Sequence, residues 1–428
     1  MIKKGERFLE EVTNHIKSKE AKKFVAAELQ FHLMKTKNSW IEKGLNEEEA
    51  EEQAVAQMGS PVVLGQELNK LHRPRIDWFI VILLVAAMGL GFLPLVALGN
   101  AGFMDTGYFL VNKIVVVLLG IAGAFGMALV DYRKFEKLGW LFYLVGTLIL
   151  LLVSYTPNIF MNGVPYIKIG PVTIESLMAL PFFFLAWASF FNNSSLKVWK
   201  LGMLFLLSLY LFLLIPNLPA AFIYIVMVFV MLWWSRLGRK RALVITMVPS
   251  CLFVIGGLLL WSTLKEYQLQ RILGYLHPEK YADGAGYMYL RLKELLSEAG
   301  WFGVSGQAEF LPAAHTDLVF ASLTYYYGYS FALILVLILV FFAARMLVIS
   351  QQVKGHYGKL LLVGGITLFA VQFIYNVGMI IGFFPITSIS LPFISYGLMP
   401  TMFNAFLMGI VLSVYRRKNL YSDGAICR

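Results

Sequence analysis

The side chain best placed for acid–base chemistry is Asp317, at the end of a polar loop and directly before a long hydrophobic run. It follows His315 and Thr316 in a His-Thr-Asp triplet. An ionised carboxylate at a membrane boundary costs free energy unless something compensates it, so such a residue points to a function. A positioned carboxylate can act as a general base. The other interpretation is that Asp317 caps the helix formed by the hydrophobic run, and the two roles are compatible.

The composition indicates a polytopic membrane protein. Of the 428 residues, 59% are hydrophobic and 14% are charged, whereas soluble domains carry about 25% charged residues. The net charge of +11 would suggest a nucleic-acid partner in a soluble protein. Here most basic residues lie in short connections between hydrophobic runs, which indicates membrane topology and no nucleic acid. Two cysteines exclude a disulfide framework and a cysteine metal site.

Ten hydrophobic runs are long enough to span a membrane. They lie near 77–98, 107–130, 138–155, 173–191, 199–214, 217–235, 242–261, 318–346, 360–382 and 389–414. Every second connection carries Lys or Arg, while those near 99–106, 215–217 and 383–388 carry neither. The positive-inside rule therefore predicts cytoplasmic termini and places Asp317 on the outer face of the membrane.

Residues 1–75 form a separate polar segment and predict a cytoplasmic domain of about four helices. Two sets of apolar residues recur there at helical spacing. The sets are Phe8, Val12 and Ile16, and Phe24, Ala27, Phe31 and Met34. A solvated structural cap and a regulatory docking module are both open interpretations. The predicted domains are 1–75, a membrane domain over 76–417, and a cytoplasmic tail over 418–428.

One outer connection, 262–317, is much longer than the others. Loops of this length are usually functional or disordered. Its apolar residues from Tyr287 to Leu296 recur at helical spacing, which predicts an amphipathic helix lying in the membrane interface. A lysine near the outer end of the second span, Lys113, is expected to extend its ammonium group to the interface.

Several motifs accompany the His-Thr-Asp triplet. They are Gly300-Trp301-Phe302-Gly303-Val304-Ser305-Gly306-Gln307, Phe310-Leu311-Pro312, Asn376-Val377-Gly378-Met379 and Leu391-Pro392-Phe393-Ile394-Ser395-Tyr396-Gly397. Together they resemble the SEDS family, the shape, elongation, division and sporulation proteins, over roughly residues 76–417. The resemblance implies an all-α fold of about ten transmembrane helices and a glycosyltransferase that polymerises lipid II into peptidoglycan. It also implies the bacterial cytoplasmic membrane as location and a class B penicillin-binding protein as partner.

The resemblance further implies a set of site residues. Asp317 falls on the essential acidic residue of the family, and it would be the general base. The residues expected to bind substrate are His315, Thr316, Ser395, Tyr396, Glu175, Arg271, Lys280, Arg291 and Lys293. The last four are candidates to bind the departing pyrophosphate. No protein metal cage is visible, so Mg²⁺ or Mn²⁺ would bind mainly through that pyrophosphate.

Two alternatives stay open for individual residues. His315 either acts as a proton shuttle or orients the loop. Ser395 and Tyr396 either line a cavity or pack helices together.

The sequence also departs from the family pattern. Ala313 and Ala314 replace polar residues, and Tyr325–Tyr327 stand where acidic residues are usual. Glu175 keeps its motif only in a shifted register. These losses keep two other functions open. One is a non-catalytic scaffold that recruits or activates a class B penicillin-binding protein, and the other is a flippase for a lipid-linked sugar.

Overall fold

The computed structural model describes residues 3–161, 163–170, 172–238, 240–247, 266–304 and 311–420. The chain divides into two compact units. The first comprises Met1–Asp77, Val353–Gly355 and Val414–Arg428, and the second comprises Trp78–Gln352 and His356–Ser413. Residues 414–417, which the sequence assigns to the membrane domain, therefore group with the N-terminal helices, as do the described residues of the tail.

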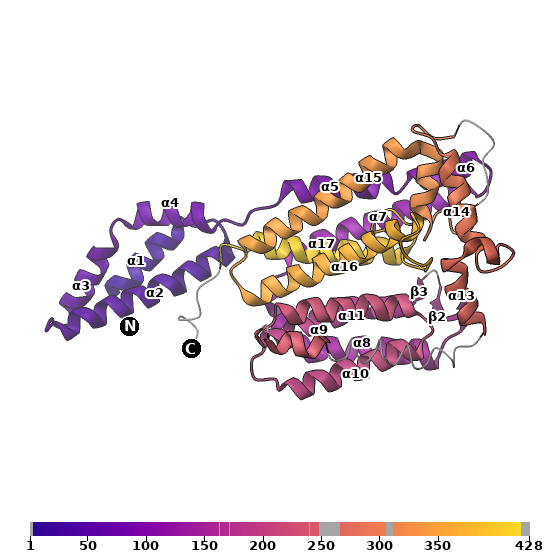
Figure 1. The fold of residues 1–428 in the computed structure, drawn as a ribbon. Coiled ribbons are helices and arrows are strands. Elements are labelled where there is room, and N and C mark those ends of the chain that lie inside the picture. Colours follow the sequence, from indigo (N-terminus) through magenta and orange to yellow (C-terminus); the bar gives the residue numbers. More distant parts are fainter. Residues whose placement is uncertain are drawn as a thin grey trace. The chain divides into compact units, whose positions relative to one another are not determined.

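The first unit contains four helices (Figure 1). They are α1 (Lys3–Asn14), α2 (Lys19–Glu42), α3 (Glu47–Met58) and α4 (Pro61–His72). The predicted stripe of α1 is buried in the core. The stripe predicted for α2 is in the wrong register, because the residues that α2 buries are Ala21, Val25, Leu29 and Leu33. Of the predicted residues, Phe24 packs against this core. Spacing of four residues keeps these side chains on one face, whereas Met34 is 55% exposed.

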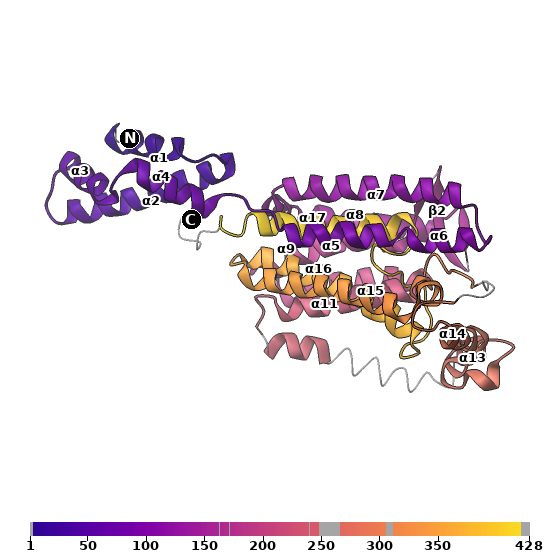
Figure 2. The same ribbon diagram turned by 90° about the horizontal axis from the view of Figure 1, so that it is seen from above.

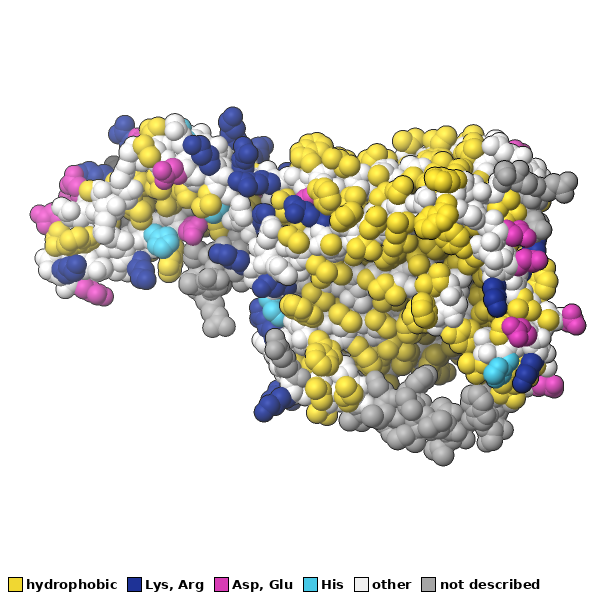
Figure 3. Space-filling view, turned by 45° about the horizontal axis from the view of Figure 1, so that its top comes forward, with side chains coloured by type: hydrophobic (Ala, Val, Ile, Leu, Met, Phe, Trp, Pro, Cys, Tyr) yellow, Lys and Arg dark blue, Asp and Glu magenta, His cyan; other side chains and the backbone are white. Residues whose placement is uncertain are grey.

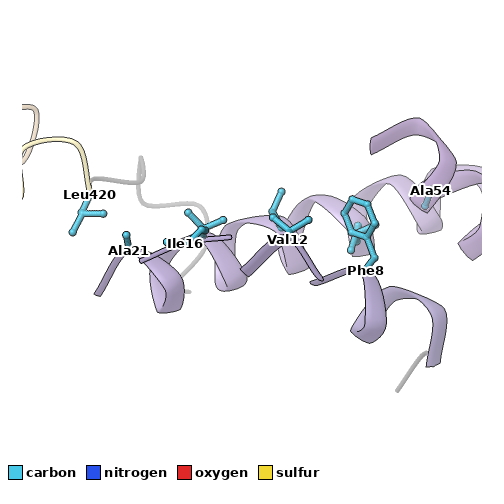
Figure 4. Packing of buried hydrophobic residues seen from close by; sticks show 9 residues of the cluster. Phe8, Val12, Ile16, Ala21, Ala54 and Leu420 are labelled. Carbon is cyan, nitrogen blue, oxygen red and sulfur yellow. The ribbon is translucent and has the colours of Figure 1, made fainter. Parts of the chain in front are cut away.

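The end of the chain contributes to the core of this unit. Leu420 packs in the same cluster as Phe8 and Val12 (Figure 4). Arg417, whose side chain is fully buried, donates from Nε and Nη2 to the two carboxylate oxygens of Glu20, at 2.9 and 2.8 Å. His72 Nδ1 lies 2.8 Å from the carbonyl oxygen of Asn419. The residues after the last helix are therefore held by α2 and α4.

We expect Glu20→Ala to destabilise the first unit. The substitution removes two charge-assisted hydrogen bonds to a buried guanidinium, which costs about 2 kcal/mol, since the Glu20 side chain itself is 40% exposed. Hydrogen exchange measured by mass spectrometry should show faster exchange in α2 and in residues 414–420. Glu52→Ala is the matched control, because Glu52 pairs with Lys4 at a site where both side chains are more than 60% exposed. Equal exchange rates in the two variants would contradict a stabilising role of the Glu20–Arg417 pair.

The second unit is an all-α polytopic membrane fold. Its first helices are α5 (Trp78–Leu90), α6 (Leu93–Asn100), α7 (Thr106–Leu129), the 3₁₀ helix η1 (Tyr132–Leu138) and α8 (Gly139–Tyr155). Then come η2 (Ser176–Ala179), α9 (Leu180–Asn192), α10 (Val198–Leu214) and α11 (Leu218–Trp233). The last are α13 (Glu266–Leu276), η4 (Pro278–Tyr281), α14 (Tyr287–Glu298), α15 (Val319–Gln352), α16 (His356–Ile380) and α17 (Leu398–Arg416).

Length and composition agree with membrane insertion. Within the described residues, six segments are long and apolar enough to cross a membrane, and three shorter apolar helices accompany them. Hydrophobic side chains cover much of the visible face of this unit (Figure 3). Most of the predicted seventh span, 242–261, lies outside the described residues, where only 240–247 are seen to be helical. The count of ten spans therefore stays a prediction.

Four details of the membrane unit differ from the sequence prediction. A small antiparallel sheet, absent from the prediction, forms from β1 (Ile159–Met161), β2 (Val164–Ile169) and β3 (Val172–Ile174). Because β3 occupies the predicted start of the fourth span, that span begins only at Ser176. The tenth begins at Leu398, since residues 389–397 are irregular. A kink at Gly328, with φ 84°, interrupts α15.

The connections that the loop charges predict to be outer gather at one end of the helices. The sheet, α6, α13 and α14 all lie there in both ribbon views (Figures 1 and 2). Tyr275 of α13 donates to the carbonyl oxygen of Phe383 at 2.8 Å, and Tyr289 of α14 accepts from the backbone N–H of Ile386 at 3.0 Å. The long predicted loop is therefore tied to the connection between α16 and α17.

Candidate active site

Asp317 lies at the end of a tight turn that leads into α15. The backbone N–H groups of Thr316 and Leu318 both donate to the carbonyl oxygen of Ala313, at 3.0 and 3.1 Å. Ala313 has a positive φ of 54°, which is rare for a residue other than glycine. The Asp317 carboxylate accepts from Ser390 Oγ at 3.2 Å. A helix cap would also accept from the first backbone N–H groups of its helix. Among the described residues, the Asp317 carboxylate accepts no hydrogen bond from the first N–H groups of α15.

Asn376 of α16 connects the Asp317 turn to the irregular segment 389–397. Its Nδ2 donates to the carbonyl oxygens of Asp317 and Ile389, at 2.8 and 2.6 Å. The side chain is completely buried. One amide therefore fixes the backbone on both sides of the Asp317–Ser390 hydrogen bond.

The same irregular segment holds the rest of the triplet. Ser395 Oγ donates to the carbonyl oxygen of Thr316 at 2.7 Å, and it accepts from the backbone N–H of Leu391 at 2.8 Å. The backbone N–H of Tyr396 donates to the carbonyl oxygen of His315 at 2.7 Å. The structure thus brings together four of the predicted binding residues, His315, Thr316, Ser395 and Tyr396, beside Asp317.

Three rings pack at the edge of this arrangement. The centroids of Phe109, His315 and Tyr396 lie 5.2 to 5.6 Å from one another. Burial lowers the pKa of His315, which favours the neutral imidazole. The ring contacts favour the role of His315 in orienting the loop.

A second carboxyl group lies near Asp317. Glu175 ends the connection between β3 and η2, before the helix of the fourth span. Burial and the nearby charge of Asp317 raise the pKa of Glu175 to about 7. Burial, together with the nearby charges of Glu175 and Asp317, raises the pKa of Tyr166 in β2 to about 12. Burial also raises the pKa of Asp317, while the hydrogen bond from Ser390 opposes that shift.

The raised pKa of Glu175 predicts a pH-dependent stability. A carboxyl group whose pKa rises on folding destabilises the native state progressively between its ordinary value, about 4.3, and its folded value. The cost is constant above about pH 7. We expect Glu175→Gln to stabilise the protein by roughly 3 kcal/mol near pH 8 and by much less near pH 5.

Thermal unfolding midpoints at the two pH values measure this effect. Glu279→Gln is the control, because Glu279 is exposed in η4. If Glu175→Gln changed the thermal midpoint equally at both pH values, the raised pKa of Glu175 would be wrong.

The four predicted phosphate-binding cations do not reach Asp317. Arg271 lies on α13, Lys280 on η4, and Arg291 and Lys293 on α14. Within the described residues none of them forms an ion pair with Asp317 or Glu175. Arg291 pairs with Glu294 at 2.7 Å, and the other three are exposed. The three exposed cations stay available to a ligand, but the structure does not place them beside Asp317.

The sequence interpretation missed several contributors. Ser390, which binds Asp317, belongs to none of the recognised motifs. Asn376 belongs to one of them but was not predicted as a site residue. Lys113 does not extend to the interface, and that prediction was wrong. Its side chain is 1% exposed, and its ammonium group donates to backbone carbonyl oxygens of the irregular segment. A lone lysine inside a hydrophobic run was the available signal.

A family model described as a cell cycle protein, FtsW/RodA/SpoVE, matches residues 75–420. The chain belongs to this family. It is the SEDS family that the motifs indicated, and the match covers the whole membrane unit.

Similar proteins extend over most of the chain. A "Probable peptidoglycan glycosyltransferase FtsW" from Coxiella burnetii is 26% identical over 80% of this chain and 97% of its own length. Another with that name, from Trichlorobacter lovleyi, is 23% identical over 79% of this chain and 92% of its own. The peptidoglycan glycosyltransferase MrdB of Escherichia coli is 28% identical over 44% of this chain and 50% of its own.

Solved structures share the fold. One, described as "Structural coordination of polymerization and crosslinking by a peptidoglycan synthase complex", has a TM-score of 0.69 and 26% identity, covering 81% of this chain and 99% of its own. The rod shape determining protein RodA of Thermus thermophilus has a TM-score of 0.58 and 23% identity, covering 81% of this chain and 98% of its own.

Proposed function

We propose that this chain polymerises lipid II into peptidoglycan glycan at the outer face of the bacterial cytoplasmic membrane, with Asp317 as general base. The names of its relatives support the reaction class. The observation that carries the residue assignment is a partly buried carboxylate at the head of α15, positioned by Ser390 and by the Asn376 bridge. Burial raises its pKa, which makes it a stronger base than an exposed aspartate.

Glycan polymerisation joins the hydroxyl of one sugar to the anomeric carbon of another. The hydroxyl is a poor nucleophile at neutral pH, so a base must take its proton as the bond forms. Asp317 accepts that proton, and the polyprenyl pyrophosphate leaves. A site at the end of the spanning helices suits this substrate, because the polyprenyl tails stay in lipid while the sugars stay outside.

The leaving pyrophosphate needs positive charge. Arg271, Lys280 and Lys293 on the outer helices are the candidates of this chain. Within the described residues, no group of three or more His, Cys, Asp or Glu is arranged to hold a metal ion. The donors at hand, Asp317 and Glu175, suit a Mg²⁺ or Mn²⁺ ion that binds mainly to substrate phosphates. Such an ion would neutralise charge on the leaving group.

We propose that Asp317 lies on the outer face of the membrane and that both chain ends lie in the cytoplasm, as the loop charges predict. α17 begins at Leu398, next to Tyr396, and ends at Arg416. Its 19 residues extend over roughly 28 Å, about the hydrophobic thickness of a membrane. The C-terminal end of α17 therefore faces the cytoplasm when Asp317 faces outward.

A class B penicillin-binding protein is the proposed partner. A relative of known structure belongs to a peptidoglycan synthase complex that couples polymerisation to cross-linking. Cross-linking of the glycan product would then follow on the partner.

The test is to supply lipid II to the purified protein and to follow glycan chains by gel electrophoresis. We expect polymer, and more of it when a class B penicillin-binding protein is added. Heat-denatured protein is the control. If no polymer formed in either condition, yet the two proteins copurified, the scaffold function would replace this proposal.

A further inference from the structure

Lys113 of α7 is a buried cation with unusual partners. Its Nζ donates to the carbonyl oxygens of Phe393, Ile394 and Ser395, at 3.1, 3.4 and 2.9 Å, and lies 3.5 Å from Thr401 Oγ1. Three carbonyl acceptors match the three N–H donors of an ammonium group. Within the described part of the chain no carboxylate contributes to this arrangement, and three of the four partners of Lys113 are backbone carbonyl groups.

The carbonyl groups need these donors because their segment is irregular and buried. Residues 391–395 are all buried and belong to no helix. The carbonyl oxygens of Leu391 and Pro392 accept from backbone N–H groups of the same segment, whereas those of Phe393, Ile394 and Ser395 accept from Lys113. Non-helical backbone at membrane depth is tolerated only where protein groups satisfy it. Phe393 also has a positive φ of 65°, a strained conformation for a residue with a side chain. Lys113 therefore fixes a turn that would not hold this shape alone.

This turn is the same one that positions the His-Thr-Asp triplet. Ser395, whose carbonyl oxygen binds Lys113, donates its hydroxyl to the carbonyl oxygen of Thr316 at 2.7 Å. The next residue, Tyr396, donates its backbone N–H to the carbonyl oxygen of His315 at 2.7 Å. A continuous series of hydrogen bonds thus connects Nζ of Lys113 to the residues directly before Asp317.

We propose that Lys113 is a positioning residue for Asp317, acting through the Phe393–Ser395 turn and without touching substrate. The proposal rests on the proposed glycosyltransferase function. The close approach of the backbone at Gly91, directly after α5, fits it, since a Cβ at Gly91 would lie 2.8 Å from the carbonyl oxygen of Phe393 and 3.2 Å from Cε of Lys113. The space around the ammonium group is filled by protein.

The experiment compares Lys113→Met, which keeps an unbranched side chain shorter by one atom and removes its donors, with Lys113→Arg, which keeps a cation. Displacing a catalytic group by about 1 Å can cost roughly 100-fold in rate. We expect Lys113→Met to lower kcat about that much while KM for lipid II stays the same, and Lys113→Arg to recover part of kcat. Ile114→Met is the matched control, because Ile114 is the next residue of α7 and is 46% exposed.

Hydrogen exchange gives a readout that needs no activity. Residues 311–318 and 389–397 should both exchange faster in Lys113→Met than in wild type, and neither should change in Ile114→Met. If wild type made no polymer, the proposed function would fail, while the exchange data would still test the positioning role. Unchanged exchange in 311–318 would overturn the proposal, as would a raised KM with an unchanged kcat.

A double-mutant cycle covers the case in which Lys113→Met does not fold. Ser395→Ala removes the hydroxyl that connects the turn to Thr316, and it should lower kcat by a similar factor. If Lys113 acts through this connection, combining Lys113→Arg with Ser395→Ala should lower kcat little further than Ser395→Ala alone. If the fold-loss in kcat of the double variant equalled the product of the two single fold-losses, the residues would act independently and the proposal would be overturned.

Discussion

Asp317→Asn should reduce glycan polymerisation by about 1000-fold, because a positioned general base typically contributes between 100-fold and 10,000-fold. Asparagine has nearly the same shape, and its amide oxygen can still accept the hydrogen bond that Ser390 donates at 3.2 Å. The substitution therefore removes the basic group and preserves the turn. The measurement is the initial rate of glycan formation from lipid II at saturating substrate.

A control separates catalysis from general charge effects. Asp283→Asn removes an exposed carboxylate between η4 and α14, and it should leave the rate unchanged. If Asp317→Asn polymerised within a few-fold of wild type while its thermal midpoint was unchanged, Asp317 would not be the base. The rate of wild type should also fall as the pH decreases through the raised pKa of Asp317, since only the ionised form accepts a proton.

Much of the fold could be predicted from sequence because it follows from local patterns. Hydrophobic runs of spanning length identified most of the helices, and the His-Thr-Asp triplet identified the turn before α15. These features depend on the order of residues along a short stretch of chain. The beginnings of the fourth and tenth spans could not be located, because β3 and the segment 389–397 are as hydrophobic as the helices that follow them.

The partners of Asp317 could not be predicted for a different reason. Ser390 and Glu175 lie 73 positions after it and 142 positions before it in the sequence, so only the packing of helices brings them close. Lys113 illustrates the same difficulty. A lysine near the end of a span commonly extends its ammonium group into the membrane interface, at little cost in free energy. Only the folded chain reveals buried carbonyl groups that require its donors.

The Asn376 side chain, which connects the Asp317 turn to the segment 389–397, is the basis for the second large effect that we expect. Asn376→Leu replaces the buried amide with an apolar side chain of similar size. The carbonyl oxygens of Asp317 and Ile389 then lose the donor that now lies 2.8 and 2.6 Å away. Each buried acceptor left without a donor costs about 1–3 kcal/mol. We expect a lower thermal midpoint, and a fall in kcat of about 100-fold because the backbone of Asp317 shifts.

The control for this prediction lies one turn earlier on the same helix. Gln372 is also buried in α16. Its Nε2 donates to the carbonyl oxygen of Leu368 within the helix, and its Oε1 accepts from Asn404 Nδ2 of α17 at 3.4 Å. Gln372→Leu therefore removes a buried amide without touching the two site segments. It should lower the midpoint with a much smaller loss of kcat. If both substitutions lowered kcat in proportion to the midpoint, Asn376 would stabilise the bundle in general, and the position of Asp317 would depend on other contacts.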